Sequence, residues 1–133
     1  ARENTKLEVI CTLTFERTAH GTYRTIMGVS PADMAAALLE AGADIIGTNC
    51  GNGMEHMADI VREIRKAAPH APILVHANPG APTTVNGKTV FPETPDIMAR
   101  YAIEVVKAGA NVVGGCCGST PDHIRAIAKA VRK

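Results

Sequence analysis

The alternation of apolar patterns along the chain constrains its fold more than any other feature. Short runs rich in β-branched residues alternate four times with segments whose apolar residues recur at helical spacing. The runs of strand length cover residues 7–14, 43–48, 72–76 and 110–115. This βαβαβαβα order predicts an α/β fold with parallel strands joined by right-handed crossovers, and with functional loops at the carboxyl ends of the strands.

The helical segments carry clear start signals. Ser30-Pro31, Thr94-Pro95 and Thr120-Pro121 each place an N-capping side chain before a proline at the first helical position. We therefore expect a helix to begin at each of these points. The polar segment 15–29 and the Pro- and Gly-rich segment 78–92 are predicted to be loops, and the length of the second is typical of a functional loop.

An internal repeat strengthens this prediction. Residues 41–47 (AGADIIG) align with residues 108–114 (AGANVVG) at an offset of 67. Continuing the alignment without a gap sets Cys50-Gly51 against Cys117-Gly118. Two βα units are therefore related, and each brings a cysteine to the same end of the predicted sheet.

The length of the chain suggests half of a barrel. Four βα units in 133 residues are about half of what a closed (β/α)8 barrel of roughly 250 residues requires. We expect a single domain over residues 1–133 that forms a (βα)4 half of a TIM-type (β/α)8 barrel. Such a half leaves sheet edges unpaired, so it should pair with a missing half-barrel or self-associate as a homo-oligomer. A small open doubly wound sheet is the alternative.

Composition argues against several function classes. Apolar residues make up 46% of the chain and charged residues 20%, which predicts a globular protein. The formal net charge of +1, the absence of a basic run and the 3% aromatic content argue against nucleic acid as a partner. No apolar stretch is long enough for a membrane span and no export signal is visible, so we expect a cytoplasmic protein with no membrane partner.

Three of the four cysteines fall at the predicted functional edge. Cys50 lies just past the second strand, and Cys116 and Cys117 end the fourth. Three thiolates with a fourth position open are typical of a catalytic zinc site. Neighbouring residues of a strand point to opposite faces, but Gly115 and Gly118 allow the backbone to turn both thiols toward one ion. In the alternative, these cysteines are buried small apolar side chains.

Two glycine-framed strings carry a resemblance to a known family. Residues 47–51 (GTNCG) and 114–125 (GGCCGSTPDHIR) resemble the homocysteine S-methyltransferase family, whose pattern is Asn-Cys after one barrel strand and Gly-Gly-Cys-Cys-Gly before the final helix. By this resemblance the chain is the second half of a homocysteine-binding barrel. Residues 78–82 (NPGAP) and the later Thr94-Pro95 look more like the branch of cobalamin-dependent methionine synthase than the betaine-dependent branch.

The resemblance also implies a chemistry. Cys50, Cys116 and Cys117 would be zinc ligands, and the thiol of homocysteine would take the fourth position for the methyl transfer that forms methionine. Coordination to a dication deprotonates a thiol and leaves a lone pair for attack on a methyl group. The residues do not identify the methyl donor, and a methylated corrinoid would have to be supplied by another domain or protein.

Two asparagines flank the expected site. Asn78, after the third strand, is predicted to fill the open metal position without substrate or to orient the substrate, with a plain turn role as the alternative. Asn49 is the candidate for binding the polar groups of the substrate. His76 and His123 are expected to be structural, His123 at the start of the last helix. Cys11, inside the first strand, is expected to be a buried structural thiol.

Two other functions stay open for this chain. A half-barrel could keep the zinc site as a non-catalytic binding module, and vicinal thiols could serve a redox or metal-storage protein. Reversible thiol oxidation without bound metal would indicate the redox function, whereas a stoichiometric metal that shields the thiols would indicate the methyltransferase lineage. Whether the chain is an enzyme by itself is left open, because its sequence matches only four of the eight βα units.

Overall fold

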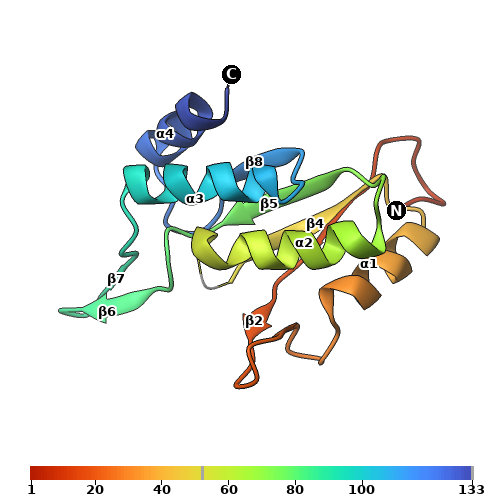
Figure 1. Ribbon diagram of the computed structural model, residues 1–133, viewed down its shortest axis with the longest axis horizontal. Coiled ribbons are helices and arrows are strands. Elements are labelled where there is room, and N and C mark those ends of the chain that lie inside the picture. The colour runs from red at the N-terminus through yellow and green to blue at the C-terminus, as the bar shows by residue number, and fades with distance from the viewer. Residues whose placement is uncertain (52, 133) are drawn as a thin grey trace.

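A four-stranded parallel sheet forms the centre of the molecule. The computed structural model describes residues 1–51 and 53–132. Its main sheet has the strands β1 (Ile10–Leu13), β4 (Ile45–Cys50), β5 (Ile73–Ala77) and β8 (Val112–Gly115) in that order (Figure 1). Every neighbouring pair is parallel. The predicted α/β fold with parallel strands is confirmed.

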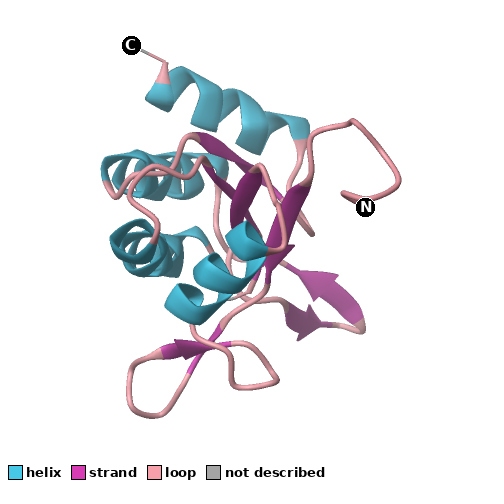
Figure 2. Ribbon diagram, turned by 90° about the vertical axis from the view of Figure 1, so that its right-hand side faces the viewer, coloured by secondary structure: helices cyan, strands magenta, loops and turns pink. Residues whose placement is uncertain are grey.

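The order of the strands identifies the kind of α/β fold. Neighbours in the sheet follow one another along the chain, and the order never reverses as it does at the switch point of a doubly wound sheet. Each of the four helices packs against the next, and Figure 2 shows them gathered on one side of the sheet. This is the arrangement in half of a TIM-type barrel. The helices are α1 (Pro31–Glu40), α2 (Met57–Ala67), α3 (Pro95–Lys107) and α4 (Pro121–Val131).

The helices begin where their start signals predict. Ser30 Oγ accepts a hydrogen bond from the Asp33 N–H at 3.0 Å, and Thr94 caps α3 in the same way. At α4, His123 Nδ1 accepts the Thr120 N–H at 3.2 Å, which is the reciprocal bond of a capping box. Within the described residues, no helix combines the length and apolar character needed to cross a membrane.

The strand boundaries differ from the prediction by a few residues. β1 is shorter than the expected 7–14, and β4 continues through Cys50, so Cys50 ends this strand instead of following it. A single 3-10 turn, η1 (Met54–His56), precedes α2. Pairing with β5 sets the end of β4, because Cys50 lies opposite Ala77. A run of β-branched residues does not show where the neighbouring strand ends, so the end of β4 could not be predicted from its own residues.

Both of the predicted loops contain a short antiparallel hairpin. The hairpins pair β2 (Glu16–Arg17) with β3 (Tyr23–Arg24), and β6 (Thr83–Val85) with β7 (Lys88–Val90). Asn86 and Gly87 connect β6 to β7 with φ angles of 50° and 74°, as a type I′ turn requires. The expectation of plain loops was wrong here, and the Asn-Gly pair is the sequence signal for the second hairpin.

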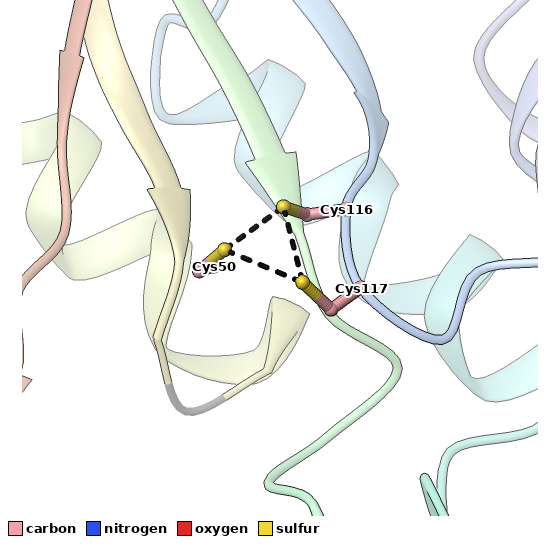
Figure 3. Close-up of side chains that lie close together, drawn as sticks. All are labelled: Cys50, Cys116 and Cys117. Atoms are coloured by element: carbon pink, nitrogen blue, oxygen red, sulfur yellow. Dashed lines mark hydrogen bonds between the residues drawn. The ribbon is translucent and has the colours of Figure 1, made fainter.

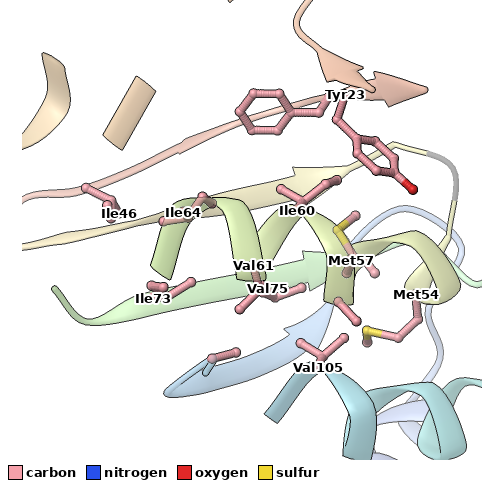
Figure 4. Packing of buried hydrophobic residues seen from close by; sticks show 14 of the residues in the cluster. Tyr23, Ile46, Met54, Met57, Ile60, Val61, Ile64, Ile73, Val75 and Val105 are labelled. Atoms are coloured by element: carbon pink, nitrogen blue, oxygen red, sulfur yellow. The ribbon is translucent and has the colours of Figure 1, made fainter. Parts of the chain in front are cut away.

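The hydrophobic core lies between the sheet and the helices. Ile46, Ile73 and Val75 point from the strands toward the helices and have no exposed surface. They belong to one cluster with Met98 and other buried side chains of α2 and α3. Figure 4 shows Ile60, Val61, Ile64 and Val105 of this cluster. On the opposite face of the sheet, Ile10 and Val112 of the edge strands are 51% and 43% exposed. The face that lines the interior of a barrel is thus partly uncovered.

Candidate metal centre

Three cysteine thiols meet at the carboxyl edge of the sheet. Cys50 is the last residue of β4, and Cys116 and Cys117 directly follow β8. The Sγ atoms of Cys50 and Cys116 are 2.9 Å apart, and the Sγ atom of Cys117 lies 3.9 Å from the first and 4.0 Å from the second (Figure 3). The structure therefore brings together the three thiols that the sequence analysis singled out.

Cys50 has an unusual backbone conformation. Its φ is 55°, in the left-handed region that residues other than glycine rarely adopt, and Gly51 follows with a φ of 71°. Such strain costs about 1–3 kcal/mol and occurs mostly at functional sites. The change of direction ends the strand alternation at this residue, and the Cys50 thiol lies next to that of Cys116 (Figure 3).

A tight turn places the two neighbouring thiols. The Cys116 N–H donates to the Ala77 carbonyl at 2.8 Å, which continues the sheet pairing for one residue beyond β8. The Ser119 N–H then donates to the Cys116 carbonyl at 3.1 Å, with Gly118 at the third position of the turn and a φ of 79°. Because the chain turns here, Cys117 leaves the alternation of the strand and both thiols face the same side.

Glycines in this turn are also needed for close packing. A Cβ atom on Gly118 would lie 2.1 Å from the Phe91 ring, and one on Gly115 would lie 2.3 Å from Ser119 Oγ. Both distances are far below van der Waals contact. Gly115 and Gly118, which are predicted to let the backbone turn, therefore also leave room for neighbouring side chains.

The two closest thiols have opposite pKa shifts. The hydrogen bond with Cys116 lowers the pKa of Cys50 most. Burial opposes this effect in part, and weaker hydrogen bonds with Asn49 and Cys117 lower the pKa further. Burial raises the pKa of Cys116 to about 11, and the hydrogen bond with Cys50 raises it further. Without metal, Cys50 therefore loses its proton more readily than Cys116. A coordinated dication removes this difference, because it deprotonates the thiols that bind it.

The sulfur atoms fit a metal ion that prefers soft ligands. All three Sγ atoms lie within 4.8 Å of one another. Tetrahedral zinc with Zn–S bonds of about 2.3 Å places neighbouring sulfurs about 3.8 Å apart. The two distances from Cys117 match this value, whereas the 2.9 Å between Cys50 and Cys116 must widen by about 0.9 Å (3.8 minus 2.9). Three protein ligands leave the fourth position of a tetrahedral ion open.

Asn78 lies directly after β5 with its side chain buried. Its exposed fraction is 6%, and its Nδ2 donates to the Gly51 carbonyl at 3.4 Å. Its Oδ1 is buried without a hydrogen-bond partner among the described residues, a situation that costs about 1–3 kcal/mol when nothing else binds the atom. The predicted turn is also present, because the Gly80 N–H donates to the Asn78 carbonyl at 2.9 Å. Asn78 thus has both a turn contact and a free acceptor.

Asn49 lies beside the thiols on the inner face of the sheet. Its Oδ1 accepts the Thr12 hydroxyl at 2.7 Å, and its Nδ2 donates to Thr14 Oγ1 at 3.2 Å. These bonds connect β4 to the end of β1. The Asn49 amide is therefore already engaged within the protein, and its role in substrate binding stays a prediction.

His123, His76 and Cys11, which are expected to be structural, differ in their burial. The structural role of His123 is confirmed, because it is buried and its Nε2 donates to the Glu93 carbonyl at 3.0 Å. His76 is half-buried on the inner face of the sheet and lies against Gly114, where a Cβ would be 3.0 Å from its ring. Cys11 is half-buried, not fully buried, because β1 is an edge strand.

Glu93 is the residue near the site that the sequence analysis missed. Its Oε2 is buried without a hydrogen-bond partner in the described part of the chain. Burial raises the pKa of this carboxyl group, and a hydrogen bond from the Met54 backbone N–H lowers it in part. The residue lies between Pro92 and Thr94 in a segment that reads as a loop, and no spacing or motif distinguishes it there.

Comparison with known proteins identifies the family. The family model for homocysteine S-methyltransferase matches residues 1–131. The chain belongs to the homocysteine S-methyltransferase family. This agrees with the resemblance of residues 47–51 and 114–125, and the parallel half-barrel is the fold that this resemblance implies.

Relatives from two branches of the homocysteine S-methyltransferase family match the chain. Methionine synthase of Mycobacterium leprae is 36% identical over 117 residues, which cover 87% of this chain and 10% of the relative. Methionine synthase of Mycobacterium tuberculosis is 35% identical over 118 residues, which cover 85% of this chain and 10% of the relative. Betaine–homocysteine S-methyltransferase 1 of Danio rerio is 36% identical over 118 residues, which cover 77% of this chain and 30% of the relative. The chain therefore spans less than a third of the length of each of these relatives.

Proposed function

We propose that the chain binds homocysteine at a zinc centre and activates its thiol as a thiolate for S-methyl transfer, with methionine as the product. The main support is the convergence of Cys50, Cys116 and Cys117 in a member of this family. An alkyl thiol is mostly protonated at neutral pH, and bound zinc would supply the charge that deprotonates it. Three thiolate ligands make the centre net negative, which favours a reactive sulfur in the fourth position.

The two asparagines have separate proposed roles. Asn78 fills the fourth metal position when substrate is absent, or orients the substrate when it is present. Its buried, unpartnered Oδ1 supports this role. Asn49 approaches the polar groups of homocysteine from the inner face of the sheet. Because its amide bonds to Thr12 and Thr14, only its remaining hydrogen-bonding capacity is available for the substrate.

The proposed reaction needs more than this half-barrel. We place residues 1–133 as a single domain, the second half of a homocysteine-binding barrel. An N-terminal half-barrel or a second copy of the chain would complete it. The exposed apolar side chains of Ile10 and Val112 on the inner face support such a partner. The residues of this half-barrel do not identify the methyl donor, and a methylated corrinoid would be supplied by another domain or protein, in keeping with the likeness of residues 78–82 to the methionine synthase branch.

Zinc titration of the purified chain tests the ligand set. We expect one zinc per chain, and a loss of affinity on the order of 100-fold or more for Cys50→Ser, Cys116→Ser and Cys117→Ser. Cys11→Ser is the matched control, because Cys11 lies on β1 outside the cluster, and its affinity should equal that of the wild type. Zinc binding that survives all three serine substitutions would contradict the proposal.

The short distance between two thiols supports a second candidate function. At 2.9 Å, the Sγ atoms of Cys50 and Cys116 are close enough to form a disulfide in a redox protein. Mild oxidation of the metal-free chain would then remove two of its four titratable thiols, and a reductant would restore them. One equivalent of zinc blocks this oxidation if the methyltransferase function is correct, whereas a redox function requires that oxidation continue in its presence.

A further inference from the structure

Residues 91–93, which we call the strap, cross the loops that carry the thiol cluster. The strap begins with Phe91, whose ring packs over Gly118 so closely that a Cβ there would lie 2.1 Å from it. Gly118 belongs to the turn of Cys116 and Cys117. One end of the strap therefore covers the loop that provides two of the three thiols.

The backbone of Glu93 connects two further segments. Its N–H donates to the Pro79 carbonyl at 3.0 Å, which attaches the strap to the loop of Asn78. Its carbonyl accepts from His123 Nε2 at 3.0 Å. His123 Nδ1 accepts the Thr120 N–H at 3.2 Å, so its proton lies on Nε2 and points to Glu93. The first turn of α4, which follows the Cys117 turn, is thus bonded to the strap.

The carboxyl group of Glu93 reaches the loop that follows Cys50. A Cβ atom on Gly53 would lie 2.6 Å from Glu93 Oε1, and one on Gly80 would lie 3.2 Å from Glu93 Cγ. The Met54 backbone N–H is a hydrogen-bond donor to the carboxyl group. Glycine at both positions leaves the space that this side chain occupies, and Met54, which it contacts, is the first residue of η1.

The place that Glu93 occupies is a costly one for a carboxyl group. Its Oε2 is buried and has no partner among the described residues. A buried acceptor without a partner costs about 1–3 kcal/mol, and more when it is charged. A purely structural contact to one backbone N–H could be made by a neutral side chain. The contact of Glu93 with the Met54 N–H is therefore made at a cost to the stability of the fold, as expected for a side chain that positions its neighbours.

We propose that Glu93 is a positioning residue of the thiol cluster. Its side chain holds the loop after Cys50, while its backbone holds the segments on the other side of the cluster, so one residue sets the distance between the thiol-bearing loops. This inference rests on the proposed function, because the distance matters only if the thiols share a metal ion. Residues that orient metal ligands without binding the metal typically change metal affinity by 10–100-fold when they are removed.

The test compares Glu93→Ala, Glu93→Gln and the wild-type chain, with Glu40→Ala as the matched control. Glu40 is an exposed carboxylate at the end of α1. Zinc affinity is measured by competition with a chromophoric chelator, and the sulfur-to-metal charge-transfer bands are recorded with Co(II). The melting temperature of each metal-free variant is measured alongside. We expect Glu93→Ala to weaken zinc binding about tenfold and to shift the Co(II) bands.

The glutamine variant makes the test specific. Its amide oxygen still accepts the Met54 N–H, so we expect zinc affinity within about twofold of the wild type and unchanged Co(II) bands. Glu40→Ala should match the wild type in every measurement. A lower melting temperature of Glu93→Ala with wild-type zinc affinity and Co(II) bands would overturn the inference, and so would equal losses of affinity in the alanine and glutamine variants. A wild-type chain that binds no zinc would instead remove the proposed function.

Discussion

The Sγ atoms of Cys50 and Cys116 lie 2.9 Å apart although the two residues are 66 positions apart in the chain. The internal repeat aligns Cys50 with Cys117, yet Cys116 is the closer of the two. The turn after β8 explains this difference, because the Ser119 N–H bonds to the Cys116 carbonyl and carries Cys117 past the end of the strand. The repeat predicts the edge of the sheet where the thiols meet, but not their order within the cluster.

Gly118→Ala should damage both the fold and the metal centre. Gly118 has a φ of 79°, and a new Cβ there would lie 2.1 Å from the Phe91 ring. We therefore expect the free energy of unfolding to fall by about 3 kcal/mol or more, and zinc affinity to fall about tenfold. Gly87→Ala is the control, because Gly87 has φ 74° but no described heavy atom within 4 Å of that position. It should lose only about 1 kcal/mol and no zinc affinity. Urea denaturation and zinc titration check both variants, and equal losses would contradict the account.

Arg65→Met should destabilise the fold without affecting the thiols. The Arg65 guanidinium lies at the amino-terminal edge of the sheet and donates five hydrogen bonds of 2.7–3.1 Å. The acceptors are the carbonyls of Ala68, Pro69, Ala71 and Gly109 and the Oδ1 of Asn111. Their loss should lower the free energy of unfolding by about 2–4 kcal/mol, measured by urea denaturation, with zinc affinity unchanged.

Arg62→Met is the matched control for Arg65. Arg62 forms an exposed ion pair with Asp59, and such pairs contribute less than about 1 kcal/mol. A loss for Arg62→Met as large as that for Arg65→Met would show that the charge, and not the hydrogen-bond network, determines the effect.

Glu93→Gln should change how stability depends on pH. Burial is the largest effect on the pKa of Glu93 and raises it, and the charge of Glu55 raises it further. The Met54 N–H and His123 lower this pKa in part, and the resulting pKa is above the ordinary value of 4.5. The folded state therefore binds this proton more tightly than the unfolded state. The stabilisation that this proton gives to the folded state is fully present below pH 4.5, and it is lost as the pH rises through the pKa of Glu93 in the folded state.

Measurement of the free energy of unfolding from acidic to neutral pH checks this prediction. Glutamine does not titrate, so the stability of Glu93→Gln relative to the wild type should increase as the pH rises. A relative stability that is constant or that decreases over this range would contradict the pKa shift of Glu93.

Zinc should stabilise the folded chain. An ion that binds only the folded state at about 100 times its Kd adds about 2.7 kcal/mol to the free energy of unfolding. We expect a higher melting temperature with zinc, its reversal by a chelator, and no response in Cys50→Ser. A melting temperature that zinc leaves unchanged in the wild-type chain would argue against a built metal site.

The parts of the fold that depend on local signals could be predicted from the sequence. A proline after Ser30 or Thr120 sets the start of a helix through its own backbone geometry and capping bonds, so the neighbouring residues contain the information. The meeting of Cys50 with Cys116 was also predictable, because parallel strands deliver their carboxyl ends to one edge.

The strap could not be predicted in this way. The contact of His123 with Glu93 joins residues 30 positions apart, and those of Glu93 with Gly53 and Gly80 depend on how three loops fold over one another. No periodicity records such contacts. The engagement of Asn49 with Thr12 and Thr14 is similar, because it depends on the register between β1 and β4.

X-ray absorption at the zinc edge, recorded on the zinc-loaded chain before and after homocysteine is added, counts the sulfur ligands of the metal. We expect one zinc with three sulfur ligands and one nitrogen or oxygen ligand, which changes to four sulfur ligands with homocysteine. A zinc ion whose sulfur count stays at three would contradict homocysteine activation and indicate a non-catalytic zinc-binding module. A chain without zinc and with all four thiols titratable would contradict the metal centre itself.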